Sequence, residues 1–214
     1  MLELSAVTYA PATVGSTVLK GVSLHAAKGQ PLLIAGASGS GKTSLLEVIS
    51  GLAGSQTGSI QWQGKTLNRR QRRWLCGMVF QFPERHFLGL TVSQELRLGH
   101  RRLGQEKEQE VLKRVGLQGI AGSTAPERLS GGQQRRLALA VQLLRGAEVL
   151  LLDEPTAGLD WSVREDVLQL LSNLATDQVL IVVTHEPELF SGWDCQRMRL
   201  RDGVLEPMTT LPRA

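Results

Sequence analysis

The chain has 214 residues, of which 42% are hydrophobic and 21% are charged, a composition typical of folded globular proteins and long enough for a substantial core. No stretch approaches the roughly 18 consecutive apolar residues of a membrane-spanning helix, and residues 1–5 lack the pattern of a secretory signal. The net charge is +4, and the two cysteines, Cys76 and Cys195, lie too far apart in the sequence to predict a disulfide framework or a zinc site, so a reducing cytoplasm is expected.

The N-terminal third predicts strands followed by a strand, a loop and a helix. Apolar residues alternate in two short segments within residues 2–24, separated by a turn-rich stretch at 10–16, which favours an antiparallel β lobe. Pro31 to Ala35 is a continuous apolar run that ends in glycine, as a strand buried on both faces would be. Apolar residues at helical spacing then continue to Gly51.

Four arginines stand within residues 69–73, the densest charge cluster of the chain. Such a cluster can contact nucleic acid, anionic lipid or an acidic partner. A solvated surface is the favoured interpretation, because the run is short and lacks interleaved aromatic residues. No nucleic-acid partner is expected.

The rest of the chain predicts a helical insertion and a parallel sheet. Residues from about 91 to 144 carry helical patterns, including 105–115, and no strand pattern. Two buried-strand candidates, 149–152 and 179–183, flank a helix with apolar positions between 163 and 174, which makes a βαβ unit. Two final strands flank Asp202 and Gly203, a strong hairpin signal.

A glycine-rich segment between the predicted strand and helix matches the phosphate-binding P-loop pattern. The segment and the residue after it are Gly36, Ala37, Ser38, Gly39, Ser40, Gly41, Lys42, Thr43 and Ser44. Glycines let successive backbone N–H groups face a phosphate, and the helix N-terminus adds its positive dipole end. Lys42 would neutralise the β- and γ-phosphates, and the Thr43 hydroxyl would bind Mg²⁺. The sequence therefore predicts an ATP site.

The second half of the metal site is expected where the strand at 149–152 ends. Asp153 follows these four apolar residues and so lies at the carboxyl end of the strand, where open α/β sheets bind ligands. It would hold Mg²⁺. The next residue, Glu154, is placed to act as the general base that deprotonates the attacking water.

Residues 129–133, Leu-Ser-Gly-Gly-Gln, form the complete signature sequence of ABC (ATP-binding cassette) ATPases, and they precede the Asp153 strand as in that family. The chain resembles the family over nearly its whole length. The remaining family motifs occur in the usual order: the A-loop aromatic Tyr9, the Q-loop Gln81, the D-loop at 157–160 and the switch histidine His185.

The resemblance implies roles for these residues. Ser130, Gly131, Gly132 and Gln133 would contact the γ-phosphate held by the P-loop of a second cassette, so two cassettes would close head to tail on two ATP molecules. Asp160 would face that partner. Gln81 would contact the γ-phosphate or Mg²⁺, and His185 would contact the γ-phosphate during catalysis.

Simpler interpretations remain open for three of these residues. Ser130 can be an ordinary helix N-cap, and both roles can hold together. Tyr9 can stack on adenine or pack within an edge strand. His185 can cap a helix or take part in catalysis.

The resemblance also implies the fold and the biological task. The expected fold is a P-loop NTPase of the α/β class in a single domain, 1–214, with a mostly parallel core sheet, an antiparallel β lobe and a helical insertion. Residues 1–80 and 145–214 would form the nucleotide-binding core and the lobe, and about 81–144 the helical subdomain. The chain would be the ATPase of a transporter, peripheral on the cytoplasmic face of a membrane and bound to separate transmembrane subunits.

Residues 81–87 point to a subfamily. A Pro-Glu pair and a phenylalanine soon after Gln81 are similar to the ATPases of energy-coupling-factor importers for vitamins and metal ions. The alternative is a soluble ABC ATPase of an assembly complex, such as one that builds iron–sulfur clusters.

Overall fold

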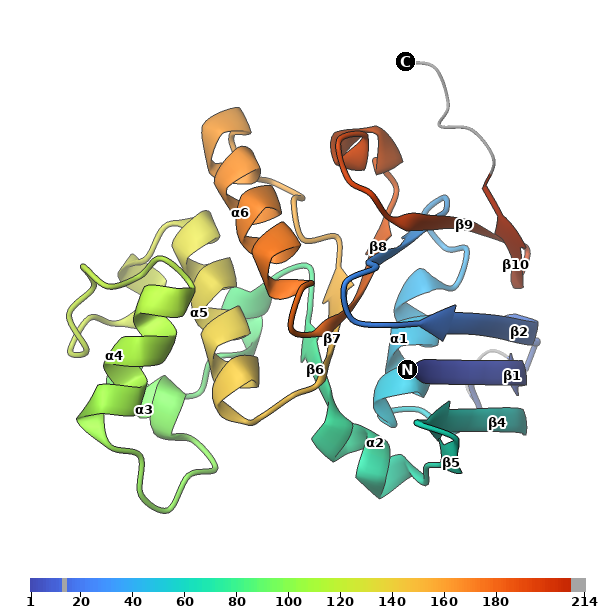
Figure 1. The fold of residues 1–214 in the computed structure, drawn as a ribbon, viewed down its shortest axis with the longest axis horizontal. Helices are drawn as coiled ribbons and strands as arrows, with labels where there is room; N and C mark the ends of the chain where they lie inside the picture. Colours follow the sequence, from blue (N-terminus) through green and yellow to red (C-terminus); the bar gives the residue numbers. More distant parts are fainter. Residues whose placement is uncertain (13–14, 209–214) are drawn as a thin grey trace.

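The computed structural model describes residues 1–12 and 15–208, so residues 13 and 14 of the expected turn at 10–16 lie outside the described residues. Two sheets form the framework (Figure 1). The larger has the strand order β10-β9-β3-β8-β7-β6, and its parallel pairs are β9 with β3, β3 with β8, β8 with β7, and β7 with β6. Its strands are β3 (Leu32–Ala35), β6 (Cys76–Val79), β7 (Val149–Asp153), β8 (Val179–Thr184), β9 (Gln196–Arg201) and β10 (Val204–Pro207).

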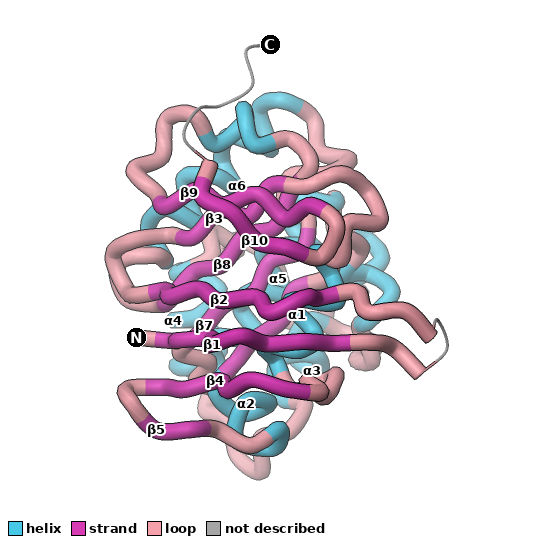
Figure 2. Tube along the Cα trace, turned by 90° about the vertical axis from the view of Figure 1, so that its right-hand side faces the viewer, coloured by secondary structure: helices cyan, strands magenta, loops and turns pink. Residues whose placement is uncertain are grey.

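The expected antiparallel lobe is a four-stranded sheet in the order β2-β1-β4-β5, which faces the viewer in Figure 2. Its strands are β1 (Leu2–Tyr9), β2 (Leu19–Ala26), β4 (Thr57–Trp62) and β5 (Lys65–Thr66). Leu4 pairs with Leu24 on one side and with Ile60 on the other, which places three apolar side chains in one row on the buried face.

Two hydrophobic clusters lie on opposite faces of the parallel sheet. In β3, Leu32 and Ile34 join the cluster shared with the lobe and the first helix, whereas Leu33 joins the cluster shared with the other long helices. Successive residues of a strand point to opposite faces. The unbroken apolar runs at 149–152 and 179–183 are therefore explained by strands that are covered on both faces.

Helices pack on both faces of the parallel sheet, and the lobe shares one face with α1. The α-helices are α1 (Lys42–Ser50), α2 (Arg69–Leu75), α3 (Val92–Arg97), α4 (Gln105–Arg114), α5 (Gly131–Leu144) and α6 (Trp161–Leu174). Short 3₁₀ helices are η1 (Pro83–His86), η2 (Pro126–Arg128) and η3 (Pro187–Phe190). The helices α3, α4 and α5 gather at the end of the molecule opposite the lobe (Figure 1). None of the helices described is both long enough and apolar enough to pass through a bilayer.

The favoured interpretation of the arginine cluster as a solvated surface is wrong for Arg72, whereas Arg69, Arg70 and Arg73 are exposed. The cluster forms α2, and Arg72 is only 4% exposed, with its Nη1 donating to the Val48 carbonyl at 2.8 Å. Arg69 and Arg73 donate to the Gly51 carbonyl at 3.3 and 3.1 Å. These carbonyls belong to the C-terminal end of α1, where cations are favourable and backbone acceptors lack helical partners.

Replacing Arg72 by Met is therefore expected to lower the free energy of unfolding by about 1–2 kcal/mol, because a charged hydrogen bond to Val48 is lost while the side-chain volume is kept. Arg70 is exposed on the same helix and supplies the matched control. Its replacement by Met is expected to change stability by less than about 0.5 kcal/mol. Urea denaturation measures both; equal stability of the two variants would contradict a capping role for Arg72.

Candidate nucleotide site

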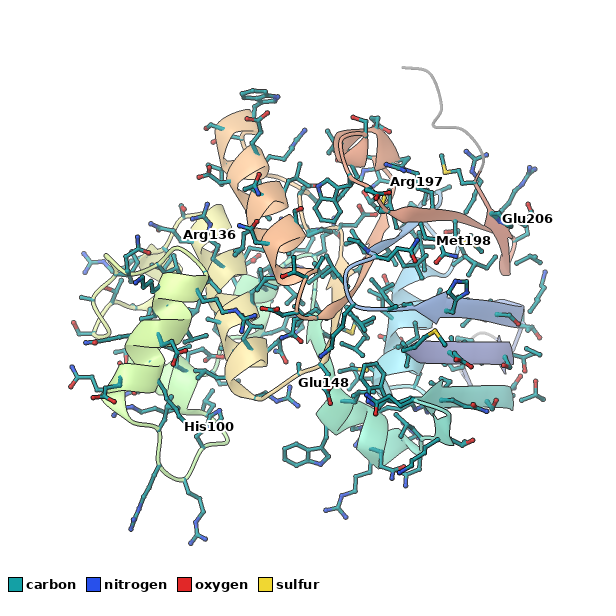
Figure 3. All side chains as sticks on the ribbon, in the orientation of Figure 1. His100, Arg136, Glu148, Arg197, Met198 and Glu206 are labelled. Atoms are coloured by element: carbon teal, nitrogen blue, oxygen red, sulfur yellow. The ribbon has the colours of Figure 1, made fainter. Side chains whose placement is uncertain are left out.

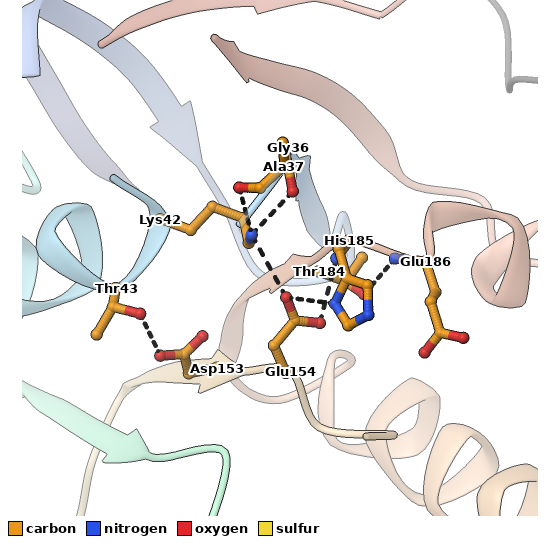
Figure 4. Close-up of polar contacts among 9 residues, drawn as sticks. All are labelled: Gly36, Ala37, Lys42, Thr43, Asp153, Glu154, Thr184, His185 and Glu186. Atoms are coloured by element: carbon orange, nitrogen blue, oxygen red, sulfur yellow. Dashed lines mark hydrogen bonds and ion pairs between the residues drawn. The ribbon is translucent and has the colours of Figure 1, made fainter. Parts of the chain in front are cut away.

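Three parallel neighbours, β3, β8 and β7, end at the same edge of the sheet, and the expected site residues follow these ends. The loop after β3 is anchored there by Gly36, whose N–H donates to the Thr184 carbonyl of β8 at 3.1 Å. Asp153 and Glu154 come from the end of β7, and His185 follows β8. Figure 4 shows these side chains converging.

The loop at residues 36–41 has the backbone of a phosphate cradle. Gly39 and Gly41 have φ values of +79° and +98°, a region that side-chain-bearing residues rarely adopt. The loop leads directly into α1, which begins at Lys42. The Ser40 hydroxyl is buried without a hydrogen-bond partner in the part of the chain that the structure describes. The loop therefore fits a phosphate group, which would use these N–H groups and this hydroxyl.

Lys42 is 7% exposed, and its ammonium group lies inside the loop. Its Nζ donates to the carbonyls of Gly36 at 2.8 Å and Ala37 at 3.1 Å, and it lies 3.4 Å from the Glu154 Oε1. The positive charge is thus held next to the cradle by weak neutral acceptors and one carboxylate. A phosphate oxygen is a stronger hydrogen-bond acceptor than a carbonyl oxygen for the Lys42 ammonium group.

Thr43 and Asp153 form the pair expected for a magnesium ion. The Thr43 Oγ1 donates to the Asp153 Oδ2 at 2.7 Å, so the two oxygens already lie together. Burial raises the pKa of Asp153, and the Thr43 hydrogen bond partly opposes that rise. Mg²⁺ prefers oxygen ligands of this kind and is completed by water and phosphate oxygens, so the pair fits the ion.

Glu154 is the centre of the contacts in Figure 4. Its Oε1 lies 2.9 Å from the His185 Nδ1, and its Oε2 accepts from the His185 backbone N–H at 3.1 Å. The residue is 6% exposed and has a φ of +48°. A non-glycine residue in this conformation carries strain of about 1–3 kcal/mol, which is found most often at functional sites.

The signature segment lies at the start of α5. Ser130 is the N-cap: its Oγ accepts from the Gln133 N–H at 3.3 Å, and the Gln133 Oε1 accepts from the Ser130 N–H at 2.9 Å. The simpler interpretation of Ser130 is thus confirmed as its role within this chain. The γ-phosphate contact stays a prediction.

The two signature glycines differ in their surroundings. A Cβ on Gly131 would lie 3.5 Å from the Leu159 Cδ2, an ordinary contact, whereas a Cβ on Gly132 would lie 2.3 Å from the Val163 Cγ1. A side chain at Gly132 would therefore displace Val163 of α6. Gly131 is exposed at the helix start and free to contact a partner.

Three further predicted residues lie apart from the contacts of Glu154. Tyr9 ends β1 and packs, half-buried, against the lobe cluster, and its carbonyl accepts from the Val18 N–H at 2.8 Å. Asp160 is exposed at the start of α6. Within residues 1–12 and 15–208, no hydrogen bond joins the Gln81 side chain to Thr43 or Asp153; the Gln81 carbonyl instead accepts from Arg135 at 2.7 Å.

Two features of this region are absent from the sequence-based prediction. Arg135, in α5, binds several backbone carbonyls near the site, and an arginine next to another arginine in a helix carries no sequence signal for burial. The second is a cleft of about 810 Å³ beside the phosphate cradle. Besides residues 35–40 and His185, its lining includes residues 16–18 and the β9–β10 hairpin at 199–203.

Comparison with known proteins agrees with this geometry. Residues 19–157 match the family described as "ABC transporter". The chain is 41% identical to the thiamine import ATP-binding protein ThiQ of Cereibacter sphaeroides, over 85% of this chain and 81% of that protein. It is 33% identical to the energy-coupling factor transporter ATP-binding protein EcfA1 of Lacticaseibacillus paracasei, over 90% of this chain and 72% of that protein.

A solved structure extends the match to the fold. The ATP-binding cassette MJ0796, described as a dimer in a post-hydrolysis state bound to ADP and phosphate, superposes with a TM-score of 0.80 at 27% identity, over 99% of this chain and all of that one. The predicted ABC ATPase fold and the ATPase assignment are confirmed by these matches. The chain therefore belongs to the ABC transporter family, as an ATP-hydrolysing, ATP-binding subunit.

Proposed function

We propose that the chain binds two MgATP molecules as a head-to-tail cassette dimer and couples their hydrolysis to import through separate transmembrane subunits. The observation that carries this proposal is the convergence of Lys42, Thr43, Asp153, Glu154 and His185 at one edge of the sheet. The cargo would be a vitamin or a metal ion. The likeness to the thiamine import protein supports the import direction and the vitamin.

Substrate binding begins with the phosphate cradle. The β-phosphate would take the inward N–H groups of residues 36–41, and the Lys42 Nζ would exchange the Gly36 and Ala37 carbonyls for β- and γ-phosphate oxygens. Thr43 and Asp153 would hold Mg²⁺, which neutralises charge on these oxygens. Tyr9 would stack on the adenine ring.

Hydrolysis then requires a base beside the γ-phosphate. Glu154 would accept a proton from water as the water oxygen bonds to phosphorus and the bond from phosphorus to the ADP oxygen breaks. His185 would orient the Glu154 carboxylate through the contacts at 2.9 and 3.1 Å and would approach the γ-phosphate. Gln81 would contact the γ-phosphate or Mg²⁺ as the helical part moves.

The second cassette completes the site. The N-terminus of α5, with Ser130, Gly131, Gly132 and Gln133, would meet the γ-phosphate held by the partner, and the exposed Asp160 would lie at the same interface. The dimeric MJ0796 cassette supports this arrangement. Residues 81–144 would act as a helical subdomain that moves against the core, on the cytoplasmic face of the membrane.

Affinity capture tests the transport role. Tagged Glu154→Gln protein is captured with ATP from gently solubilised cells, and a tagged Lys42→Ala variant, which lacks the phosphate-binding ammonium, is the matched control. Polytopic membrane proteins are expected in amounts comparable to the tagged chain. Recovery of soluble partners alone would overturn the proposal in favour of an assembly complex.

A further inference from the structure

Arg135 is a buried arginine that joins three parts of the site. It lies in α5, five residues after the N-cap Ser130, and is 4% exposed. Its Nη2 donates to the Gln81 carbonyl at 2.7 Å, and its Nη1 donates to the carbonyls of Pro155 and, at 3.3 Å, Ala157. One side chain therefore connects the signature helix, the segment after β6 and the segment after β7.

Arg135 has no charged partner among the described residues. It forms no ion pair with a carboxylate in the part of the chain that the structure describes, and its buried Nε has no hydrogen-bond partner there. Its hydrogen bonds offset the cost of burying the charge, and all of their acceptors are neutral backbone carbonyls from other segments. Because a guanidinium is planar and rigid, its N–H donors fix the relative positions of the backbone segments that they bind.

Two of the carbonyls that Arg135 binds belong to residues that follow the proposed base in the chain. Pro155 directly follows Glu154, and the Ala157 N–H donates to the Glu154 carbonyl at 3.1 Å, which closes a tight turn over residues 154–157. Arg135 thus binds the turn that includes Glu154, whose φ is positive. Its other bond holds the backbone of Gln81.

We propose that Arg135 is a positioning residue, which aligns Glu154 and Gln81 for hydrolysis only when α5 is docked on the sheet. This inference rests on the proposed role of Glu154 as the base. A shift of α5 would break the bonds to Gln81, Pro155 or Ala157, so the position of the signature helix and the alignment of the base are linked by one guanidinium. A misalignment near 1 Å is enough to lower a rate by about 100-fold.

The test compares Arg135→Met, which keeps the length of the side chain and removes its donors, with Arg135→Lys, which restores a single charged donor group. Arg136→Met is the matched control, because Arg136 lies on the next position of α5, between α5 and α6 (Figure 3), and pairs with Asp166 at 3.0 Å. For each purified full-length chain, kcat, KM for ATP, MgATP affinity and melting temperature are measured.

We expect Arg135→Met to lower kcat by about 10- to 100-fold while KM and MgATP affinity change less than about twofold. Arg135→Lys should recover part of kcat, and Arg136→Met should leave kcat within about twofold. Combining Arg135→Met with Gln81→Ala should cost less than the product of the two single effects, because both disturb the same alignment.

Several outcomes would overturn the inference: an unchanged kcat, a loss confined to KM, multiplicative effects in the double variant, or failure of both Arg135 variants to fold. Glu154→Gln is measured in parallel. Full turnover in Glu154→Gln would show that Glu154 is not the base. Loss of turnover in Glu154→Gln together with normal turnover in Arg135→Met would refute only the role of Arg135.

Discussion

Replacing Glu154 by Gln is expected to reduce ATP turnover by at least about 100-fold while MgATP still binds, because the amide cannot accept the proton of the attacking water. The substitution keeps the shape of the side chain and leaves an amide oxygen to accept from the His185 N–H. The affinity for ATP should change little, since the phosphate contacts come from residues 36–43. The ATP-bound dimer should accumulate, because hydrolysis no longer reopens it.

Glu186→Gln is the control for this prediction. Glu186 follows His185 directly, and among the described residues its backbone N–H donates to the Thr184 Oγ1 at 3.0 Å while its side chain forms no hydrogen bond or ion pair (Figure 4). Its neutralisation should leave turnover within about twofold. Steady-state phosphate release and size-exclusion chromatography with and without ATP measure the two variants. Near-normal turnover in Glu154→Gln would refute a general-base role.

Replacing Gly131 by Asp should abolish ATP-driven dimerisation and, with it, turnover. The new carboxylate would lie at the N-terminus of α5, where it satisfies the free N–H groups and repels a γ-phosphate brought by the partner. Like charges forced together at an interface cost several kcal/mol, so the dimer dissociation constant should rise by at least about 100-fold. Within the chain the same carboxylate is favourable by about 0.3–1 kcal/mol, so the monomer should not be destabilised.

Gly131 is a better position than Gly132 for this test. A side chain at Gly131 meets only an ordinary contact with Leu159, whereas one at Gly132 would collide with Val163 and loosen α5 from α6. Gly131→Ala provides the uncharged control and should still dimerise. The assay is light scattering with and without ATP in the Glu154→Gln background. Loss of nucleotide binding by the Gly131→Asp monomer would contradict an action through the partner.

The parts of the fold that could be predicted are those with strong periodic patterns. β3, β7 and β8 are buried on both faces and therefore read as unbroken apolar runs, and the hairpin at 202–203 has a specific turn signal. By contrast, only Ile60 of β4 is fully buried, and β6 begins with Cys76 and Gly77, so neither strand shows a distinctive apolar pattern. The helix α2 has arginine where a core residue would be expected.

The chemistry of the site could be predicted more completely than its supporting contacts. Two motifs supply the main site residues: the loop before α1 supplies Lys42 and Thr43, and the end of β7 supplies Asp153 and Glu154. Because β3 and β7 end at the same edge of the sheet, the topology brings these side chains together. Arg72 and Arg135 bind backbone carbonyls that come from segments distant in sequence. A local sequence pattern cannot predict a hydrogen-bond partner from a distant segment, and arginine is usually exposed.

The pairing of β6 with β7 also affects how the chain is made. Cys76 pairs with Val149, and the helices α3, α4 and α5 lie between the two strands in the sequence. A ribosome that adds 5–20 residues per second would complete β7 on the order of 4–15 s after β6, and until then β6 lacks the strand that it pairs with in the described sheet. The local helices between them can form in about a microsecond. The nascent chain should therefore show a helical intermediate with an open sheet edge, the stage at which a chaperone would be most needed.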